Sequence, residues 1–394
     1  MKLCVGAELK EPHSEEPHST IICFSHLRWD FVYQRPQHLL SRAARSHAVY
    51  FFEEPLFEKL EEPRLKLLAH SSGVTVATPV LPEGLDGPTT ASIQRHLLNR
   101  LLSGITTKPL ISWYYTPMAL TFSRYMRCDL CVYDNMDELS AFAGAPPELL
   151  ALEKELFGRA DVVFTGGRSL YEAKRGRHLN IHSFPSSIDL AHFAFARTFV
   201  GPEPEDQAQI PHPRVGFFGV IDERMNLPLV AELAQMRPDW HLVMIGPVAK
   251  IDVRSLPQAP NVHWLGSKPY SDLPKYLARW DAGMMPFALN ESTRFISPTK
   301  TPEFLAAGVP VVSTPIPDVV RPYGMRGLVE IAETAEGFAH RIGSLLNRNH
   351  QDWRARAEQQ LASSSWDRTW DSMEALIIQG LNRRHTPGLA VAAE

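Results

Sequence analysis

Short apolar runs alternate along the first half of the chain with longer stretches in which apolar side chains recur at helical spacing. The apolar runs predict buried strands, because a strand covered on both faces of a parallel sheet reads as a continuous apolar segment. The predicted strands are 19–24, 49–52, 74–79, 110–115, 130–133 and 161–165, and the predicted helices are 36–46, 91–104 and 148–158. This alternation indicates a doubly wound α/β domain.

The same alternation begins again after a proline-rich, acidic stretch, which is typical of a linker. Further strands are predicted at 214–221, 240–245, 262–265, 282–286 and from Val311, and further helices at 273–280, 333–348, 351–362 and up to Leu381. The fold class is therefore α/β, with two Rossmann-like doubly wound domains. The predicted division is a flexible start (1–18), a first domain (19–198), a linker (199–213), a second domain (214–364), a closing helix (365–383) and a flexible tail (384–394).

Composition excludes several classes of protein. The net charge of −4 over 394 residues argues against nucleic acid as the main partner. The four cysteines are too few for a disulfide framework at this length, and the Cys128–Cys131 spacing has no second pair to complete a zinc site. No apolar run approaches the roughly 18 residues that a membrane span needs, and the first residues lack the apolar core of a signal peptide. We therefore expect a cytoplasmic protein.

The most informative stretch of the sequence is 297–313, which reads as loop, short helix, tight stop and buried strand. Gly308 is the expected left-handed stop of the helix. The start of the helix is open between two registers. In the first register, the helix begins at Pro298 and is bent by Pro302. In the second, Thr301 caps the helix and Pro302 is its first residue.

In either register the free backbone N–H groups of a helix start lie beside Lys300, and this combination favours an anion, above all phosphate. Glu303 lies one turn further along the helix. Its carboxylate would repel phosphate but could accept two hydrogen bonds from the hydroxyl groups of a ribose. A cation for a diphosphate and a carboxylate for a ribose together predict a nucleotide-sugar site.

The stretch resembles the donor-site signature of the GT-B glycosyltransferases, in the form of the retaining family 4. This resemblance implies two domains facing across a cleft and a closing helix that crosses back to the first domain. It implies that Glu303 binds the donor ribose. It also implies a diphosphate site made of Ser297, Pro298, Thr299, Lys300 and Thr301. One departure is Phe295, where the family often has a second Glu that contacts the donor sugar.

Further candidate donor-site residues follow other strands of the second domain. Gly219 and Gly246 each end a predicted strand, where a glycine lets the backbone approach a ligand closely. The family places a basic residue after the first of these strands. Val220 replaces the usual Arg here, which leaves Arg224 as the candidate, and a planar guanidinium suits a diphosphate. Because the ends of parallel strands share one edge, we expect Gly219, Gly246, Lys268, Asn290 and Lys300 to form a single pocket.

The first domain supplies the candidate acceptor site. The loop after its first strand is unusually rich in polar and aromatic residues, namely His26, Arg28, Trp29, Asp30, Gln34 and Arg35. Asp134 and Asp137 follow another strand end, and the resemblance places Asp134 where the family often has a reaction-centre His. Arg168 begins a helix in the manner of an anion site. We assign acceptor binding to His26, Arg28, Trp29, Asp137 and Arg168.

These observations predict the transfer of a sugar from a nucleotide diphosphate sugar to a saccharide or lipid-linked acceptor. The resemblance implies retention of anomeric configuration, and we assign catalysis to Asp134, Arg224 and Lys300. No metal or other cofactor is expected, because the second domain has no Asp-x-Asp cluster. A peripheral contact with the inner face of the membrane stays open. So do two other functions on the same fold, a nucleotide-sugar epimerase and a non-catalytic scaffold for polysaccharide assembly.

Overall fold

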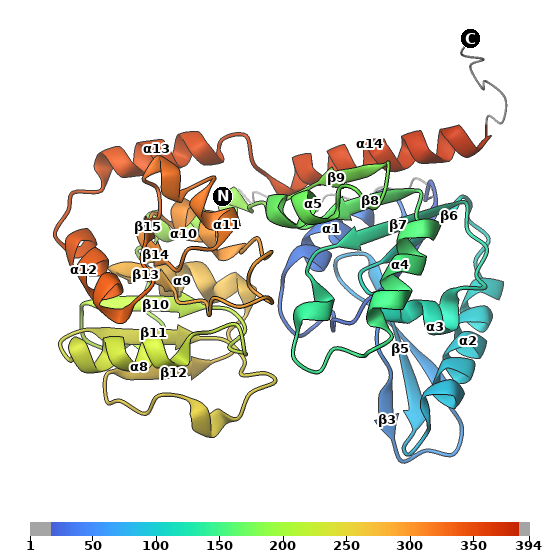
Figure 1. Ribbon diagram of the computed structural model, residues 1–394, viewed down its shortest axis with the longest axis horizontal. Coiled ribbons are helices and arrows are strands. Elements are labelled where there is room, and N and C mark those ends of the chain that lie inside the picture. Colours follow the sequence, from blue (N-terminus) through green and yellow to red (C-terminus); the bar gives the residue numbers. More distant parts are fainter. Residues whose placement is uncertain (1–16, 386–394) are drawn as a thin grey trace, which may run out of the picture.

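The structure, a computed structural model, describes residues 17–385 and contains two α/β units side by side (Figure 1). The first unit has a nine-stranded sheet in the order β3-β5-β2-β1-β6-β7-β8-β9, with β4 antiparallel to β5. Its strands are β1 (Thr20–Phe24), β2 (Ala48–Phe52), β3 (Leu56–Glu58), β4 (Arg64–Ala69), β5 (Val74–Pro82), β6 (Leu110–Tyr114), β7 (Leu130–Asn135), β8 (Val162–Thr165) and β9 (Ile181–Ser183). Its helices are α1 (Arg35–Ala43), α2 (Gly87–Ser103), α3 (Leu120–Ser123), α4 (Leu149–Arg159) and α5 (Arg168–Lys174).

The second unit has a six-stranded parallel sheet in the order β12-β11-β10-β13-β14-β15. Its strands are β10 (Arg214–Phe218), β11 (His241–Ile245), β12 (Val262–Gly266), β13 (Ala282–Met285), β14 (Val311–Ser313) and β15 (Glu330–Ile331). The remaining helices are α6 (Leu190–Ala194), α7 (Glu205–Ala208), α8 (Leu227–Met236), α9 (Leu273–Leu277), α10 (Lys300–Ala307), α11 (Pro317–Val320), α12 (Ala335–Leu346), α13 (Gln351–Leu361) and α14 (Trp366–His385). Two sheets of doubly wound type confirm the predicted fold class.

Apolar strands explain why the centre of each sheet is buried on both faces. All five residues of β1 are buried, and β1 pairs in parallel with β2 and β6, so that Phe24 lies opposite Phe52 and Tyr114. Strands β3, β4 and β9 were not predicted. Five of the six residues of β4 are exposed. Its apolar run is only Leu67–Ala69, preceded by Lys66, which is too short to mark it as a buried strand.

The chain passes into the second unit earlier than its composition suggests. Ile188 and Phe193 are buried in the same core cluster as Phe218 of the second sheet, and so is Ile210 inside the predicted linker. The prediction of a linker at 199–213 is therefore wrong, because the buried Ile210 and the hydrogen bond from Gln207 to the carbonyl oxygen of Tyr276 fix that stretch to the second unit. The segment that crosses between the units is the extended stretch 184–188, which follows β9.

The chain crosses between the units a second time just before its last helix. Trp366, Trp370, Met373 and Ile377 of α14 are buried in the core of the first unit. The two crossings touch, because the backbone N–H of Trp366 donates to the carbonyl oxygen of Ile188 at 3.3 Å. Figure 1 shows α13 above the second unit and α14 lying along the first.

Candidate functional site

A cavity of about 720 Å³ lies between the two units. One wall is formed by the loops after strands β10 to β13 together with the start of α10, and the opposite wall by the loop between β1 and α1. Of the five residues expected to share this edge, Gly219, Gly246, Lys268 and Lys300 line the cavity, whereas Asn290 does not. The carboxyl ends of the parallel strands therefore form the site, as expected for open α/β sheets.

Helix α10 begins at Lys300, so neither of the two registers considered from the sequence is correct. Thr299 is the N-cap, Pro302 is the third helical residue, and Gly308 ends the helix with a left-handed φ of 76°, as predicted. Proline is tolerated in the first turn because the backbone N–H groups there have no partner within the helix. Pro302 has no N–H, and the N–H of Thr301 donates to the carbonyl oxygen of Pro298 at 3.2 Å. The helix start therefore offers fewer free amides to an anion than the sequence suggested, and the side chain of Lys300 carries more of that role.

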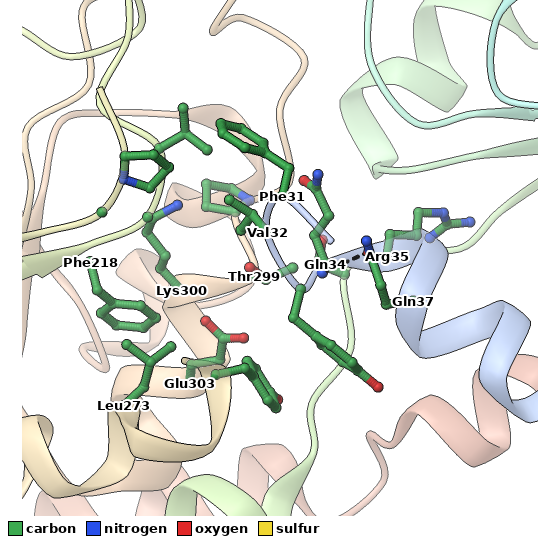
Figure 2. A pocket seen from close by; sticks show the side chains of 18 of the residues that line it. Phe31, Val32, Gln34, Arg35, Gln37, Phe218, Leu273, Thr299, Lys300 and Glu303 are labelled. Carbon is green, nitrogen blue, oxygen red and sulfur yellow. Dashed lines mark hydrogen bonds between the residues drawn. The ribbon is translucent and has the colours of Figure 1, made fainter. Parts of the chain in front are cut away.

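Lys300 and Glu303 lie on the same wall of the cavity, facing the loop that holds Phe31 and Val32 (Figure 2). Burial lowers the pKa of Lys300, and the nearby Arg224 lowers it further. Burial also raises the pKa of Glu303, which the positive charge of Lys300 opposes. Both groups are thus held in a poorly solvated place, where a ligand charge or hydroxyl interacts more strongly than it would in water.

Glycines at the ends of β10 and β11 make room for Lys300. Gly219 has a φ of 124°, and a Cβ atom there would lie 2.2 Å from Cε of Lys300. Gly246 has a φ of 144°, and a Cβ atom there would lie 1.9 Å from the carbonyl oxygen of Gly219. Both positions require glycine for their backbone conformation and for the space around them. The structure shows these glycines in close contact with Lys300 and with each other, which brings the two loops together under the lysine side chain. The predicted close approach to a ligand stays a prediction.

Arg224 lines the cavity and is held in place by Asp222. Its Nη2 donates to Oδ2 of Asp222 at 2.6 Å, and its Nε lies 3.0 Å from Oδ1. Its guanidinium also lies over the ring of Phe142 from the first unit, 5.5 Å from the centroid. Asp137 lines the same cavity, and burial raises its pKa to about 6 despite the neighbouring positive charge of Arg224. The site thus places a fixed guanidinium on one wall and a poorly solvated carboxylate on the other.

The loop between β1 and α1 forms the first-unit wall, and its start is fixed by the buried carboxylate of Glu53. The backbone N–H of Trp29 donates to Oε1 of Glu53 at 2.7 Å, and Nη1 of Arg28 donates to Oε2 at 3.1 Å. At its far end, the ring of Tyr33 stacks on Tyr270 of the second unit with centroids 4.5 Å apart. Sequence reasoning did not identify Tyr33 or Tyr270 as site residues, because a single aromatic residue in a loop carries no distinguishing pattern.

Asp134 does not line the cavity, so the assignment of this residue to catalysis is corrected. Its carboxylate is fully buried and accepts hydrogen bonds from Nε of Arg35 at 3.0 Å and from Nη2 at 2.9 Å. Nη1 of Arg35 also donates to the carbonyl oxygen of Phe184 at 2.7 Å. Arg35 lines the cavity, and Asp134 orients it from behind. The sequence could not show this, because the two residues are 99 positions apart.

Three residues assigned to acceptor binding lie elsewhere. His26 and Arg28 do not line the cavity, and Arg28 instead donates to the carbonyl oxygens of Glu54 and Pro55. Arg168 borders a second cavity.

The helix start at Arg168, expected to bind an anion, already holds one from the same chain. The backbone N–H groups of Arg168 and Ser169 donate to the carboxylate of Asp318 at 2.7 and 2.9 Å. Asp318 belongs to α11 of the second unit. The expected acceptor role of this helix start is therefore replaced by a contact that joins the two units.

Within residues 17–385, no three His, Cys, Asp or Glu side chains gather in a way that could hold a metal ion. In the same part of the chain no helix has both the length and the apolar character needed to cross a membrane.

Comparisons with known proteins agree with this architecture. The chain superposes on sucrose-phosphate synthase of Thermosynechococcus elongatus with a TM-score of 0.69 and 13% identity, covering 93% of this chain and 100% of that one. It superposes on HepE of Anabaena, in complex with UDP and glucose, with a TM-score of 0.65 and 14% identity over 92% and 100% of the two chains. The E. coli trehalose-6-phosphate enzyme bound with UDP-2-fluoro glucose gives a TM-score of 0.68 at 13% identity, over 92% and 99%. The chain therefore has the GT-B fold of glycosyltransferases.

Sequence comparison adds a family match, which lies almost entirely in the second unit. Residues 212–348 match the model of the family described as glycosyl transferases group 1. TuaH of Bacillus subtilis strain 168, assigned to teichuronic acid biosynthesis as a glycosyltransferase, is 26% identical over 248 residues. That match covers 57% of this chain and 61% of TuaH. The resemblance drawn from residues 297–313 is thus confirmed by independent similarity.

Proposed function

We propose that the protein transfers a sugar from a nucleotide diphosphate sugar to a saccharide or lipid-linked acceptor of a cell-surface polysaccharide. The observation that carries this proposal is the arrangement of Lys300, Arg224 and Glu303 around one interdomain cavity. Two cations suit a diphosphate, and a buried carboxylate suits the hydroxyl groups of a ribose. The family match at residues 212–348 and the similarity to TuaH support this donor and acceptor chemistry.

The chemical task of such a site is to stabilise the diphosphate as the bond to the sugar breaks. Negative charge develops on the leaving oxygen, and cations fixed in a poorly solvated cavity stabilise it without having to reorganise. Asp222 holds the guanidinium of Arg224 in one orientation. Gly219 leaves space for the side chain of Lys300, which is the second cation. We assign leaving-group stabilisation to Arg224 and Lys300, and we withdraw Asp134 from this role.

The acceptor is proposed to bind against the first-unit wall, where Trp29, Asp137 and the loop up to Gln34 face the donor side. Retention of anomeric configuration and independence of a metal ion remain part of the proposal. The proposal also includes action in the cytoplasm, with or without a peripheral contact with the membrane. It includes no nucleic acid among the partners. The anomer of the product, read by NMR, tests retention, and an inverted product would contradict it.

The test of the whole proposal is thermal unfolding with UDP, GDP, dTDP and CMP, each with and without magnesium. A ligand at about a hundred times its dissociation constant adds about 2.7 kcal/mol to the free energy of unfolding. We expect one nucleoside diphosphate to raise the melting temperature without magnesium, and the Lys300→Ala variant to lose this shift. If none of the nucleotides shifts the transition, the cavity is not a donor site and the scaffold function is favoured.

A further inference from the structure

A second cavity of about 540 Å³ lies where the chain crosses between the two units. Its walls come from the first crossing at Phe184–Ser187, from the second crossing at Ser363–Ser365, and from α11 with the residues that follow it. All three segments join or border both units, so this hinge cavity is bounded by the parts of the chain that hold the two units together.

The hinge cavity is lined by three arginines, Arg168, Arg321 and Arg368, and by one carboxylate, Asp318. The carboxylate of Asp318 is bound within the protein, because its oxygens accept hydrogen bonds from the two backbone N–H groups at the start of α5. Glu172, which does not line the cavity, pairs with both Arg168 and Arg321 and so occupies only part of their donors. Within residues 17–385, Arg368 pairs with no carboxylate. The cavity therefore has an excess of positive charge.

Hydroxyl groups cover much of the remaining wall. They belong to Ser363, Ser364, Ser365, Thr369 and Ser372 on one side and to Ser186 and Ser187 on the other. A hydroxyl can both donate and accept hydrogen bonds, which matches the hydroxyl groups of a sugar. A guanidinium matches a phosphate or a carboxylate. The volume lies within the range of small-molecule sites, which is about 300 to 1,000 Å³.

We propose that the hinge cavity binds an anionic saccharide, a sugar that carries a phosphate or a carboxylate, at a place separate from the donor cavity. The two cavities share the wall formed by Ser186, Ser297 and Pro298. Two hydrogen bonds close that wall, from the hydroxyl of Ser186 to the carbonyl oxygen of Ser297 at 2.5 Å and from its backbone N–H to the Ser297 hydroxyl at 3.2 Å. A ligand in the hinge cavity would touch the back of the loop that leads into α10.

Isothermal titration of the full chain with mannose 6-phosphate and with glucuronate tests this proposal, with glucose as the uncharged control. The Arg368→Gln variant removes from α14 the exposed cation whose Nη1 donates to the carbonyl oxygen of Ala362 at 3.5 Å. The matched control is Arg383→Gln, which makes the same change on the same helix outside the hinge cavity. Lys300→Ala removes a cation from the donor cavity instead. No step of this experiment requires transferase activity, so its result is independent of the proposed function.

We expect at least one charged sugar to bind more tightly than glucose, and Arg368→Gln to weaken that binding about tenfold, since a hydrogen bond to a charged group contributes about 1.5–3 kcal/mol. Arg321→Gln should weaken it in the same direction. Arg383→Gln and Lys300→Ala should leave the affinity within about twofold, which is less than the loss of one such bond. Equal binding of glucose and the charged sugars would overturn the proposal. So would a loss of binding in Lys300→Ala as large as that in Arg368→Gln, because the anion would then occupy the donor cavity.

Discussion

The amino group of Lys300 lies directly over Gly219, so closely that a Cβ atom at the glycine would lie 2.4 Å from Nζ. The lysine is at the start of α10 and the glycine is at the end of β10, more than eighty residues earlier in the chain. The same amino group lies 5.5 Å from the centre of the Phe217 ring. This cation is therefore supported by backbone and an aromatic face, and a ligand can provide its negative partner.

Replacing Lys300 with alanine should reduce turnover at least about tenfold, equivalent to about 1.4 kcal/mol of transition-state stabilisation. The reason is that the variant loses a fixed cation from the place where the leaving diphosphate is proposed to lie. Steady-state kinetics with the nucleotide sugar found by thermal shift measures this. Lys275→Ala is the control, since Lys275 is on α9, outside the cavity, and pairs with Asp272. Near-normal turnover in Lys300→Ala would remove this residue from the site.

Arg224→Ala should also reduce turnover at least about tenfold. The chain contains a matched control in Arg254, which pairs with Asp252 two positions earlier in the same geometry as Arg224 with Asp222. The Arg254 pair is exposed and does not line the donor cavity. We expect Arg254→Ala to keep its kinetics. Equal losses in the two variants would mean that the effect comes from the local turn and not from the cavity.

Gly246→Ala should disturb the donor side of the cavity, because its Cβ atom would lie 1.9 Å from the carbonyl oxygen of Gly219. Gly266 offers a comparison, since it also ends a strand with a positive φ but has open space around the missing side chain. Alanine at position 266 should cost only the roughly 1–2 kcal/mol of a left-handed backbone. Thermal unfolding should show a larger loss for Gly246→Ala, with weaker nucleotide binding. Similar losses at both positions would contradict the close approach of the two loops.

Asp134→Ala should reduce the free energy of unfolding by about 3–5 kcal/mol, because it leaves the buried guanidinium of Arg35 without its partner. Glu58→Ala, which breaks the exposed pair with Arg64, should cost less than about 1 kcal/mol. Denaturant unfolding measures both. In the double variant Asp134→Ala, Arg35→Met the losses should be less than additive, because the unpaired buried charge is no longer present. Additive losses would show that the two residues do not act as a pair.

Asp137→Asn should stabilise the protein at pH 8 and lose this advantage on acidification. Burial raises the pKa of Asp137 to about 6, so the folded state disfavours the ionised carboxylate. Above pH 6 that ionised form costs stability, and the uncharged amide avoids the cost. As the pH falls from about 6 towards the ordinary carboxyl pKa near 4, the wild-type side chain takes up its proton and the difference disappears. A difference in melting temperature that does not change between pH 8 and pH 4 would contradict this environment.

The buried central strands and the existence and end of α10 could be predicted because each rests on local sequence. Apolar runs identify strands buried on both faces. Gly308 ends α10 with a left-handed φ, which glycine adopts because it has no side chain. Both predicted starts of α10 were wrong, since Pro302 is compatible with several positions in a first turn. The structure resolves this in favour of Lys300.

The features that could not be predicted depend on partners far apart in the chain. The sequence predicts a catalytic role for Asp134, but its carboxylate binds Arg35. The sequence also predicts an anion site at the start of α5, but Asp318 occupies that site. The linker was misplaced for a related reason. Its proline-rich composition suggested exposure, whereas Ile210 within it is buried against the second sheet. Local sequence indicates which interactions a residue could make. Burial and distant partners determine which of these interactions are still open to a ligand.

The two crossings between the units have a consequence for motion. A body attached at one point can swing and twist in many directions, whereas a body attached at two neighbouring points turns mainly about the line through them. Ile188 and Trp366 lie on these two connections and are joined by a backbone hydrogen bond. We therefore expect any rotation of the second unit to occur mainly about the line through these two connections. Lys300 and Arg224 would then move relative to Asp137 along a single arc, so the donor wall and the acceptor wall would meet in the same alignment each time the units close.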